Sequence, residues 1–464
     1  MKSKPKSISK VLIWQIITQI LLTGIATLTT PIFTRLLSKA EYGAFTNFSS
    51  WVAVVGVILS LQTAGSIANA KSRYEKRDYP KYLSSILVLT SVGFIVAIIA
   101  SILCRHLFGS LFKVDERIVP LVFVISFFSY VISFYERVLS LELSVEKNAV
   151  IALLKSVGTL LLSLLFVNIM PVDKYFGRVY GMLVPLAVIS VYEMSDIMRR
   201  GRRVYDKEYW KYCLKLTTPL IFHALAGMVL SLSDRIMLTR MKGEESTAVY
   251  GVAYSLGNIL NTIWVAFNNT WVPFYYQYKK EQNSEEINRK LKNYTLVYSI
   301  ISVGFLLCTP EVFKLFAPST YWDGLSIIPP IVMGYYFNFM YSIFGNFEFY
   351  HEKTRMISVG TTICAIGNII LNILLIPIMG ELGAAIATVG AYALLYVFHY
   401  IISKKVLKIE CEIKNHFLVI GMIIVAAFSV GFYFTLEYTV IRWIVAVLLG
   451  CILIRRIIVR KSIL

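Results

Sequence analysis

Two opposite charges stand side by side inside an apolar segment of this chain. Asp234 and Arg235 occur in the stretch SLSDRIMLTR, and His223 lies eleven residues earlier. A charge at the centre of a membrane helix costs about 2.5–3.5 kcal/mol on insertion scales, so it usually serves a transport path or a partner. Because histidine titrates near physiological pH, Asp234 and His223 are candidates for coupling to protons or another cation. The alternative is that both residues lie near opposite membrane interfaces and extend toward water.

Polar side chains recur at helical spacing in three other apolar segments. They are Gln19, Thr23, Thr27, Thr30 and Thr34; Tyr254, Asn258, Asn261 and Asn268; and Thr361, Asn368 and Asn372. This spacing places each set on one face of its helix. Such a face either forms hydrogen bonds between helices, worth about 0.6 kcal/mol on average, or lines a polar cavity. The five asparagines, Asn258, Asn261, Asn268, Asn368 and Asn372, are candidate substrate-binding residues.

Single charges near the ends of apolar segments form a third group. They are Arg35, Glu136, Arg137, Lys155, Glu193, Asp196, Glu348 and Arg442. Each is more often an interfacial residue than a site. Taken together, cations facing a lumen would suit a substrate that carries phosphate, which arginine binds through two parallel hydrogen bonds.

The segments that carry these residues have the length of membrane-spanning helices. The chain has 464 residues, of which 57% are hydrophobic and 16% charged. A helix needs roughly 20 apolar residues to cross a bilayer, and by that measure about fourteen spans are expected. They cover residues 11–34, 43–67, 83–104, 118–139, 150–170, 177–197, 216–239, 248–275, 293–315, 325–349, 357–378, 381–402, 417–436 and 440–458.

The basic residues fall on every second connection between these spans. With a cytoplasmic N-terminus, about 33 of the 46 Lys and Arg lie on the cytoplasmic side, as the positive-inside rule requires. An even number of spans then makes the C-terminus cytoplasmic as well. The net charge of +19 is explained by this topology facing anionic lipids, and with no recognition module visible we expect no binding to nucleic acid.

The motifs of soluble catalysis are missing from the sequence. There is no Walker loop, H-E-x-x-H or G-x-S-x-G, and the longest hydrophilic stretch, roughly residues 198–215, is too short for a catalytic domain. The six cysteines are isolated, which predicts neither disulfides nor zinc. We therefore expect a protein that is not an enzyme and has no cofactor, apart from a coupled H⁺ or Na⁺.

The chain contains an internal repeat. At a shift of 206 residues, Glu146-Lys147, Pro171 and Gly177 align with Glu352-Lys353, Pro377 and Gly383, and at 208 Tyr42-Gly43 aligns with Tyr250-Gly251. The shift spans six predicted helices, so the halves share one orientation about an axis along the membrane normal. We predict an all-α polytopic membrane protein of two six-helix lobes related by that pseudo-two-fold axis, residues 1–205 and 206–405, plus two further helices in 406–464.

Three stretches resemble bacterial polysaccharide flippases of the Wzx type, in the multidrug/oligosaccharidyl-lipid/polysaccharide exporter superfamily. They are TPIFTRLLSKAEYGAF, SLSDRIMLTRMKGEESTAVYGVAYSLGNIL and YHEKTRMISVGTTICAIGNIILNILLIPIMGELGAAIAT. The resemblance implies a V-shaped two-lobe protein of the bacterial inner membrane. It would carry undecaprenyl-pyrophosphate-linked oligosaccharide repeat units to the outer leaflet for O-antigen or another surface polysaccharide. Membrane lipids, a polysaccharide polymerase and chain-length machinery would be its partners.

Within the matched motifs, the resemblance assigns the cationic lumen to Arg35 and Arg235, and it also includes Asp234. Related lipid II flippases carry more arginines early in the first lobe, whereas this chain has Arg35 there, which argues against lipid II as cargo. Two other functions remain open. A drug or solute antiporter of the same superfamily would be expected to carry a carboxylate in the first lobe's core, and the first span has none. A polysaccharide polymerase would need a longer outer loop than any predicted here.

Overall fold

The computed structural model describes residues 8–407 and 409–460, and within these ranges it leaves out the side chains of residues 8–17, 19–20, 222–223 and 456–460. Throughout the described ranges the regular structure is helical and no strand occurs. The chain forms two compact units that divide between Met228 and Val229. The helix α9 (Lys207–Lys242) contributes to both units. The predicted all-α class is confirmed.

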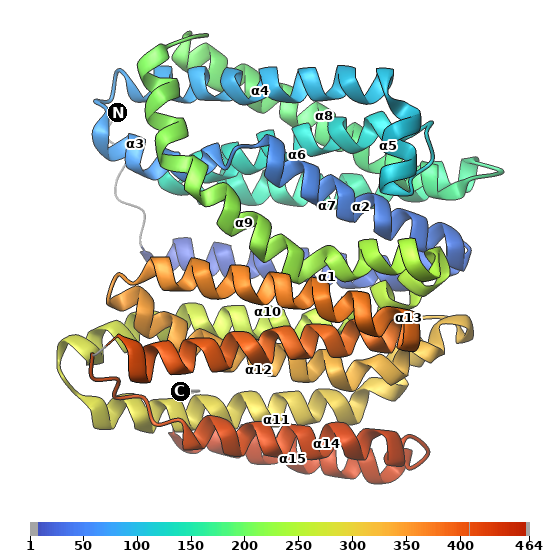
Figure 1. Ribbon diagram of the computed structural model, residues 1–464, viewed down its shortest axis with the longest axis vertical. Helices are drawn as coiled ribbons and strands as arrows, with labels where there is room; N and C mark the ends of the chain where they lie inside the picture. The colour runs from blue at the N-terminus through green and yellow to red at the C-terminus, as the bar shows by residue number, and fades with distance from the viewer. Residues whose placement is uncertain (1–7, 408, 461–464) are drawn as a thin grey trace. The chain divides into compact units, whose positions relative to one another are not determined.

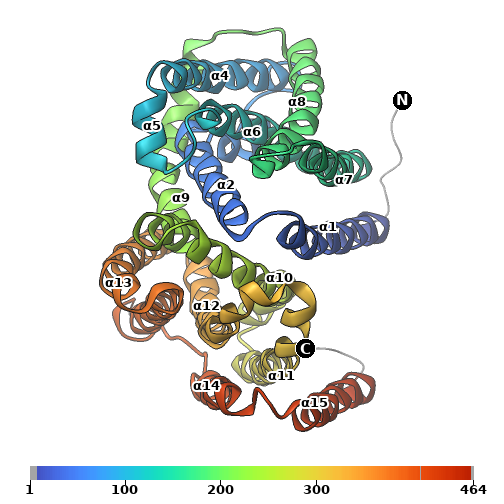
Figure 2. The ribbon, with the colours of Figure 1, turned by 90° about the vertical axis from the view of Figure 1, so that its right-hand side faces the viewer.

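The first unit contains α1 (Ile8–Leu36), α2 (Lys39–Leu59), η1 (Thr63–Ser66), α3 (Ile67–Arg73), α4 (Tyr79–Leu103), α5 (Arg105–Phe112), α6 (Val119–Leu141), α7 (Val145–Ile169) and α8 (Lys174–Gly201). The second contains α10 (Glu244–Lys280), α11 (Ser284–Phe316), η2 (Ser319–Ile327), α12 (Ile328–Tyr350), α13 (Thr354–Ile401), η3 (Ile402–Val406), α14 (His416–Thr435) and α15 (Thr439–Arg460). Within the first unit, α7 packs between α8 and α1, and within the second, α14 and α15 pack on α11 (Figures 1 and 2).

Each of the fourteen predicted spans lies on a helix, with two differences in detail. Spans 357–378 and 381–402 form the single element α13, which is interrupted at Gly380 by a positive φ of 55°. The predicted span 43–67 is too long, because α2 ends at Leu59. After it, Leu61 and Gln62 adopt left-handed backbone angles. Within the described residues, nine helices are long and apolar enough to cross a membrane, or ten if the two parts of α9 count as one span.

Local sequence sets the start of α2 and ties it to another helix. The hydroxyl of Ser38 accepts a hydrogen bond from the amide of Glu41 at 3.2 Å, and the Glu41 carboxylate accepts one from the Ser38 amide at 2.9 Å. This reciprocal pair is a capping box, which satisfies amides that have no partner within the helix. The second oxygen of Glu41 accepts from the backbone amide of Lys174 at 2.7 Å. One side chain therefore fixes the entry to both α2 and α8.

Charged groups also connect two loops of the first unit. Arg117 donates to Asp115 at 2.7 Å and to Asp173 at 2.8 Å, which joins the α5–α6 loop to the α7–α8 turn. The hydrogen bond from the Arg117 side chain holds the pKa of Asp115 below its usual value. Because these side chains are largely exposed, solvent screens the pair and its effect on stability is small.

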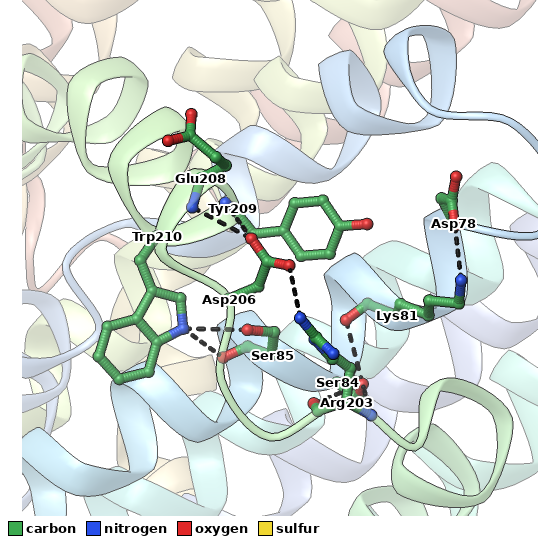
Figure 3. A network of polar contacts seen from close by, with 9 residues as sticks. All are labelled: Asp78, Lys81, Ser84, Ser85, Arg203, Asp206, Glu208, Tyr209 and Trp210. Atoms are coloured by element: carbon green, nitrogen blue, oxygen red, sulfur yellow. Dashed lines mark hydrogen bonds and ion pairs between the residues drawn. The ribbon is translucent and has the colours of Figure 1, made fainter.

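The connection between α8 and α9 carries the basic RRGRR stretch and is anchored on α4. Ser84 donates to the carbonyl of Arg203 at 2.9 Å, and the indole of Trp210 donates to Ser85 at 3.0 Å (Figure 3). The Asp206 carboxylate accepts from the amides of Glu208 and Tyr209 at the start of α9 and lies 3.2 Å from Arg203 (Figure 3). The polar side chains of this connection thus replace the hydrogen bonds that a helix end lacks.

The repeat seen in the sequence corresponds to two helical hairpins, one in each unit. One is α7 with α8 and the other is formed by the two parts of α13. In both, the turn contains a residue with positive φ, Asp173 at 51° and Gly380 at 55°. The aligned glycines Gly177 and Gly383 both sit against the backbone of the preceding helix, where an added Cβ would come within 2.6 Å and 2.3 Å of it. These glycines are retained in both halves because the helices touch there.

We predict opposite effects for two glycine-to-alanine changes in membrane helices. A Cβ at Gly181 of α8 would lie 2.3 Å from the backbone of Ser163, whereas one at Gly93 of α4 would meet no atom within 4 Å. Gly181→Ala should destabilise the protein by about 1–3 kcal/mol through overpacking. Gly93→Ala should be neutral or stabilising by up to about 1 kcal/mol, since alanine is the better helix former. Thermal denaturation of the two purified variants in detergent decides this; equal melting temperatures would contradict the contact.

Candidate functional site

The Asp234 carboxylate is the centre of a buried polar cluster in the second unit. Its side chain is 1% exposed. It accepts hydrogen bonds from the Tyr250 hydroxyl, from the backbone amide of Arg235 at 3.1 Å and from the Thr388 hydroxyl at 3.4 Å. These donors come from α10, α9 and α13, so the carboxylate holds three helices together. The internal repeat aligns Tyr250 with Tyr42, and this alignment is the one feature of the sequence that indicates Tyr250.

Two of the predicted asparagines lie in the same part of the unit. The Ser233 hydroxyl donates to the side-chain oxygen of Asn368 at 2.8 Å, and the Asn372 amide donates to that same oxygen at 3.1 Å. Both asparagines are buried, and the Asn372 oxygen has no hydrogen-bond partner among the described residues. Ser233, Asn368 and Asn372 thus form one hydrogen-bonded group between α9 and α13, and Asp234 and Thr388 form another between the same two helices. Oxygen ligands are those that hard cations prefer.

Arg235 is next to Asp234 in the sequence, but its side chain has different neighbours. Its guanidinium lies 5.0 Å from the centre of the Tyr254 ring, a cation–π contact. Its Nε is buried and has no hydrogen-bond partner within the described chain. Tyr254, Tyr335, Thr388 and Tyr392 close around an adjoining gap that is too small for a water molecule. The arginine is therefore held against the Tyr254 ring, with a buried Nε that makes no hydrogen bond among the described residues.

The asparagine stripe on α10 divides into two parts. Asn258 is exposed, and its side-chain oxygen accepts from Asn261 at 3.1 Å. Asn268 instead accepts from Asn346 of α12 at 2.9 Å. Asn258 and Asn261 therefore present polar atoms on the surface of the second unit, whereas Asn268 contributes to packing between helices.

The predicted residues on α1 belong to the first unit. Arg35 is exposed in the last turn and donates to the carbonyl of Pro31 at 2.7 Å. Thr30 and Thr34 are buried. The side chains of Gln19 and His223 lie outside the described residues, so the suggested role of His223 in coupling stays a prediction.

A cavity of about 410 Å³ in the first unit, lined by apolar and by hydroxyl-bearing side chains, was not anticipated from the sequence. Its polar lining comes from α2, α6 and the segment between α2 and η1, and consists of Ser49, Ser60, Gln62, Ser126, Ser129, Tyr130 and Ser133. Ser126, Ser129 and Ser133 recur at intervals of three and four on α6, a stripe of the kind noted on other helices. Serine is a weaker signal than asparagine because it often bonds to its own helix, as Ser126 and Ser133 do here.

A second unanticipated feature is the aromatic surrounding of Arg178 on α8. The guanidinium carbon lies 3.8 Å from the ring centre of Phe45, 4.3 Å from that of Phe33 and 5.4 Å from that of Tyr42. All three rings belong to the TPIFTRLLSKAEYGAF stretch. These contacts of TPIFTRLLSKAEYGAF therefore pack the end of α1 and the start of α2 against α8.

Most other charges singled out in the sequence have partners from another helix. Lys155 pairs with Glu136 at 2.8 Å, and Arg442 pairs with Glu311. The His399 ring contacts the Glu348 carboxylate at 2.8 Å, and both residues are completely buried. These pairs stabilise helix packing.

Comparisons with known proteins agree with this description. A family model described as "Polysaccharide biosynthesis protein" matches residues 8–279. No curated protein matches the sequence. A solved structure of the lipid II flippase MurJ in an inward closed conformation is similar with a TM-score of 0.74 at 15% identity, covering 95% of this chain and 97% of that one.

Two further solved structures, both of transporters of the MOP superfamily, have a fold similar to that of this chain. An inward-facing multidrug resistance transporter of the MATE family, in the MOP superfamily, gives a TM-score of 0.65 at 13% identity, with coverage of 89% and 98%. A MOP superfamily transporter from Pyrococcus furiosus gives 0.54 at 14% identity, with coverage of 91% and 95%. The family model covers more than half of the 464 residues, so the chain belongs to the polysaccharide biosynthesis protein family and has the two-lobe helical fold of these membrane transporters.

Proposed function

We propose that this protein moves undecaprenyl-pyrophosphate-linked oligosaccharide repeat units from the cytoplasmic to the outer leaflet of a bacterial inner membrane. The two lobes would alternate access to the two sides, with both chain termini cytoplasmic. The product would supply O-antigen or another surface polysaccharide, and a polymerase and chain-length machinery would act on it next. Membership of the polysaccharide family and the flippase-like fold support this proposal.

The observation that carries the proposal is the environment of Arg235. A partly exposed arginine within an apolar helix, held against an aromatic ring, suits an anionic group on a substrate. A pyrophosphate linkage is such a group. Arg35 supplies a second cation, on the first unit. The serine-lined cavity and the Asn258–Asn261 pair offer hydroxyl and amide groups for sugar hydroxyls.

Coupling of the cycle to a cation is the second part of the proposal. Asp234 with Asn368, Asn372 and Thr388 would hold Na⁺, or Asp234 alone would take up H⁺. A cation there would compete with the hydrogen bond from Tyr250 and thereby change the contacts between α9, α10 and α13. Occupancy could then bias one conformation of the second unit over another.

A drug or solute antiporter is the competing function, because a multidrug transporter shares the fold. The two functions differ in the molecule that accumulates when the protein is missing. Deletion of the gene should abolish surface polysaccharide and leave complete lipid-linked repeat units on the cytoplasmic leaflet. Quantifying undecaprenyl-pyrophosphate glycans and their leaflet tests this. No change in either pool would favour the antiporter, and single units exposed outside would point to a polymerase.

Substitution of Arg235 tests its contact with the anionic group. Arg235→Gln should lower the rate of glycan export by about ten- to a hundredfold, since a hydrogen bond to a charged group contributes about 1.5–3 kcal/mol. Arg240→Gln is the matched control, because Arg240 is an exposed cation about one and a half turns away in the same helix. Export is measured as surface polysaccharide at equal protein abundance. Equal export by both variants would remove Arg235 from the substrate site.

The coupling role of Asp234 is tested by transport into vesicles. Asp234→Asn preserves the size of the side chain but removes its charge, so transport should lose its response to an imposed Na⁺ or pH gradient. Asp323→Asn is the matched control, since it removes an exposed carboxylate of the same unit without touching the cluster. A full gradient response in the Asp234→Asn variant would exclude this site as the coupling site.

A further inference from the structure

Glu193 is a buried carboxyl group of the first unit that has no use in the proposed function. It lies on α8 and its side chain is 0% exposed. Neither of its carboxyl oxygens has a hydrogen-bond partner among the described residues. An ionised carboxylate in such a position is strongly unfavourable unless a cation pairs with it. The charge state of Glu193 therefore depends on the cations near it.

The nearby cations are engaged with other carboxylates. The charged groups around Glu193 are Glu136, Lys155 and Lys147. Lys155 is 2.8 Å from Glu136. Lys147 donates to the Tyr135 hydroxyl and lies 3.8 Å from Asp196. In this arrangement Glu193 lies near the Glu136 carboxylate, which is already paired with Lys155. No positive charge is therefore left to pair with Glu193.

The groups on every helix packed against α8 lead to the same conclusion. Ionisable side chains on these helices are Tyr130, Tyr135, Glu136 and Arg137 of α6, with Glu142 directly after it; Glu146, Lys147 and Lys155 of α7; Tyr79, Lys81 and Tyr82 of α4; and Lys39, Glu41 and Tyr42 of α2, beside Lys174, Tyr175, Arg178, Tyr180, Tyr192, Asp196, Arg199 and Arg200 of α8 itself. Arg200 is bound to Asp196 at 2.6 Å and to Glu142 at 3.2 Å. The α2 groups lie at the far end of α8, where Glu41 accepts from the amide of Lys174.

We propose that Glu193 is a proton-binding site whose ionisation is controlled by the partner of Lys155. While Lys155 pairs with Glu136, Glu193 holds its proton. When Lys155 moves to Glu193, the proton leaves to water and Glu136 loses its partner. The two carboxyl groups thus compete for one ammonium group, so a change in packing between α6, α7 and α8 would exchange a proton.

The ion pair beside Glu193 reaches the surface of the unit. The side chains of Lys155 and Glu136 are 32% and 30% exposed, unlike that of Glu193. Glu193 lies eight residues before the end of α8 at Gly201, about 12 Å along the helix. The basic RRGRR stretch forms that end of α8 and the two residues after it. The partly exposed ion pair therefore connects the buried carboxyl group to the surface of the unit.

Infrared spectroscopy of the purified full-length protein in detergent tests the site without any cargo. A protonated carboxyl group has a carbonyl-stretch band that an ionised carboxylate lacks. At neutral pH the wild-type protein should show this band, and the difference spectrum of wild type minus Glu193→Gln should contain the contribution of Glu193, apart from other buried carboxyl groups such as Asp234 and Glu348. Asp196→Asn is the matched control on the same helix, because Asp196 is already paired with Arg200 and contributes no such band. An unchanged band in Glu193→Gln would overturn the proposal.

A second variant tests control by Lys155. Glu136→Gln frees Lys155 to pair with Glu193, so the band of Glu193 should disappear at neutral pH although Glu193 is still present. A merely structural carboxyl group would keep its band in this variant, which would overturn the competition for Lys155. Size-exclusion profiles and helical content confirm that each variant is folded. These measurements detect the protonation of a carboxyl group and do not depend on transport. Their outcome is therefore independent of the flippase proposal.

Discussion

The structure depends on one constraint, which is that hydrocarbon offers no hydrogen-bond partners. Every backbone amide in a membrane span must find its acceptor within the protein, and helices achieve this within each segment. The described chain is accordingly helical throughout its regular structure. Where a helix has to end, side chains take over this role, as Ser38 and Glu41 do at α2 and Asp206 does at α9. The loops are short because few backbone groups can be satisfied outside helices.

The same constraint decides where polar side chains can stand. A buried charge is retained where another helix supplies a partner, as Tyr250 does for Asp234, His399 for Glu348 and Glu311 for Arg442. Each such pair also fixes the packing of two helices. Glu193 is different, because neither of its carboxyl oxygens has a hydrogen-bond partner in the described chain, whereas each of those groups has at least one. A buried carboxyl group in this condition is unfavourable for folding alone, and this is why we place proton binding there.

The two hairpins show how one repeat has diverged while its close contacts were kept. Gly177 and Gly383 both allow a helix to touch the backbone of its neighbour. The turns differ, since residues 170–173 separate α7 from α8, whereas α13 continues through Gly380. The polar residues differ more. Arg178 of the first unit stands among aromatic rings, and in the second unit Asp234 binds Tyr250, the residue aligned with Tyr42. Contacts between helices were thus preserved, and the charges were free to change.

The sequence alone determined the helical class, the positions of most long helices and the presence of a repeat, because apolar length and the spacing of landmarks are properties of the chain itself. It also indicated Asp234, Asn368 and Asn372, since polar residues stand out in apolar segments. Only the tertiary structure decided which of them meet. Asn368 binds Ser233 and Asn372, Asn268 binds Asn346, and Asn258 is exposed. It alone revealed the serine-lined cavity and the missing partners of Glu193. The reason is physical: helical spacing tells which side chains share a face, but which residues that face meets depends on helices distant in sequence.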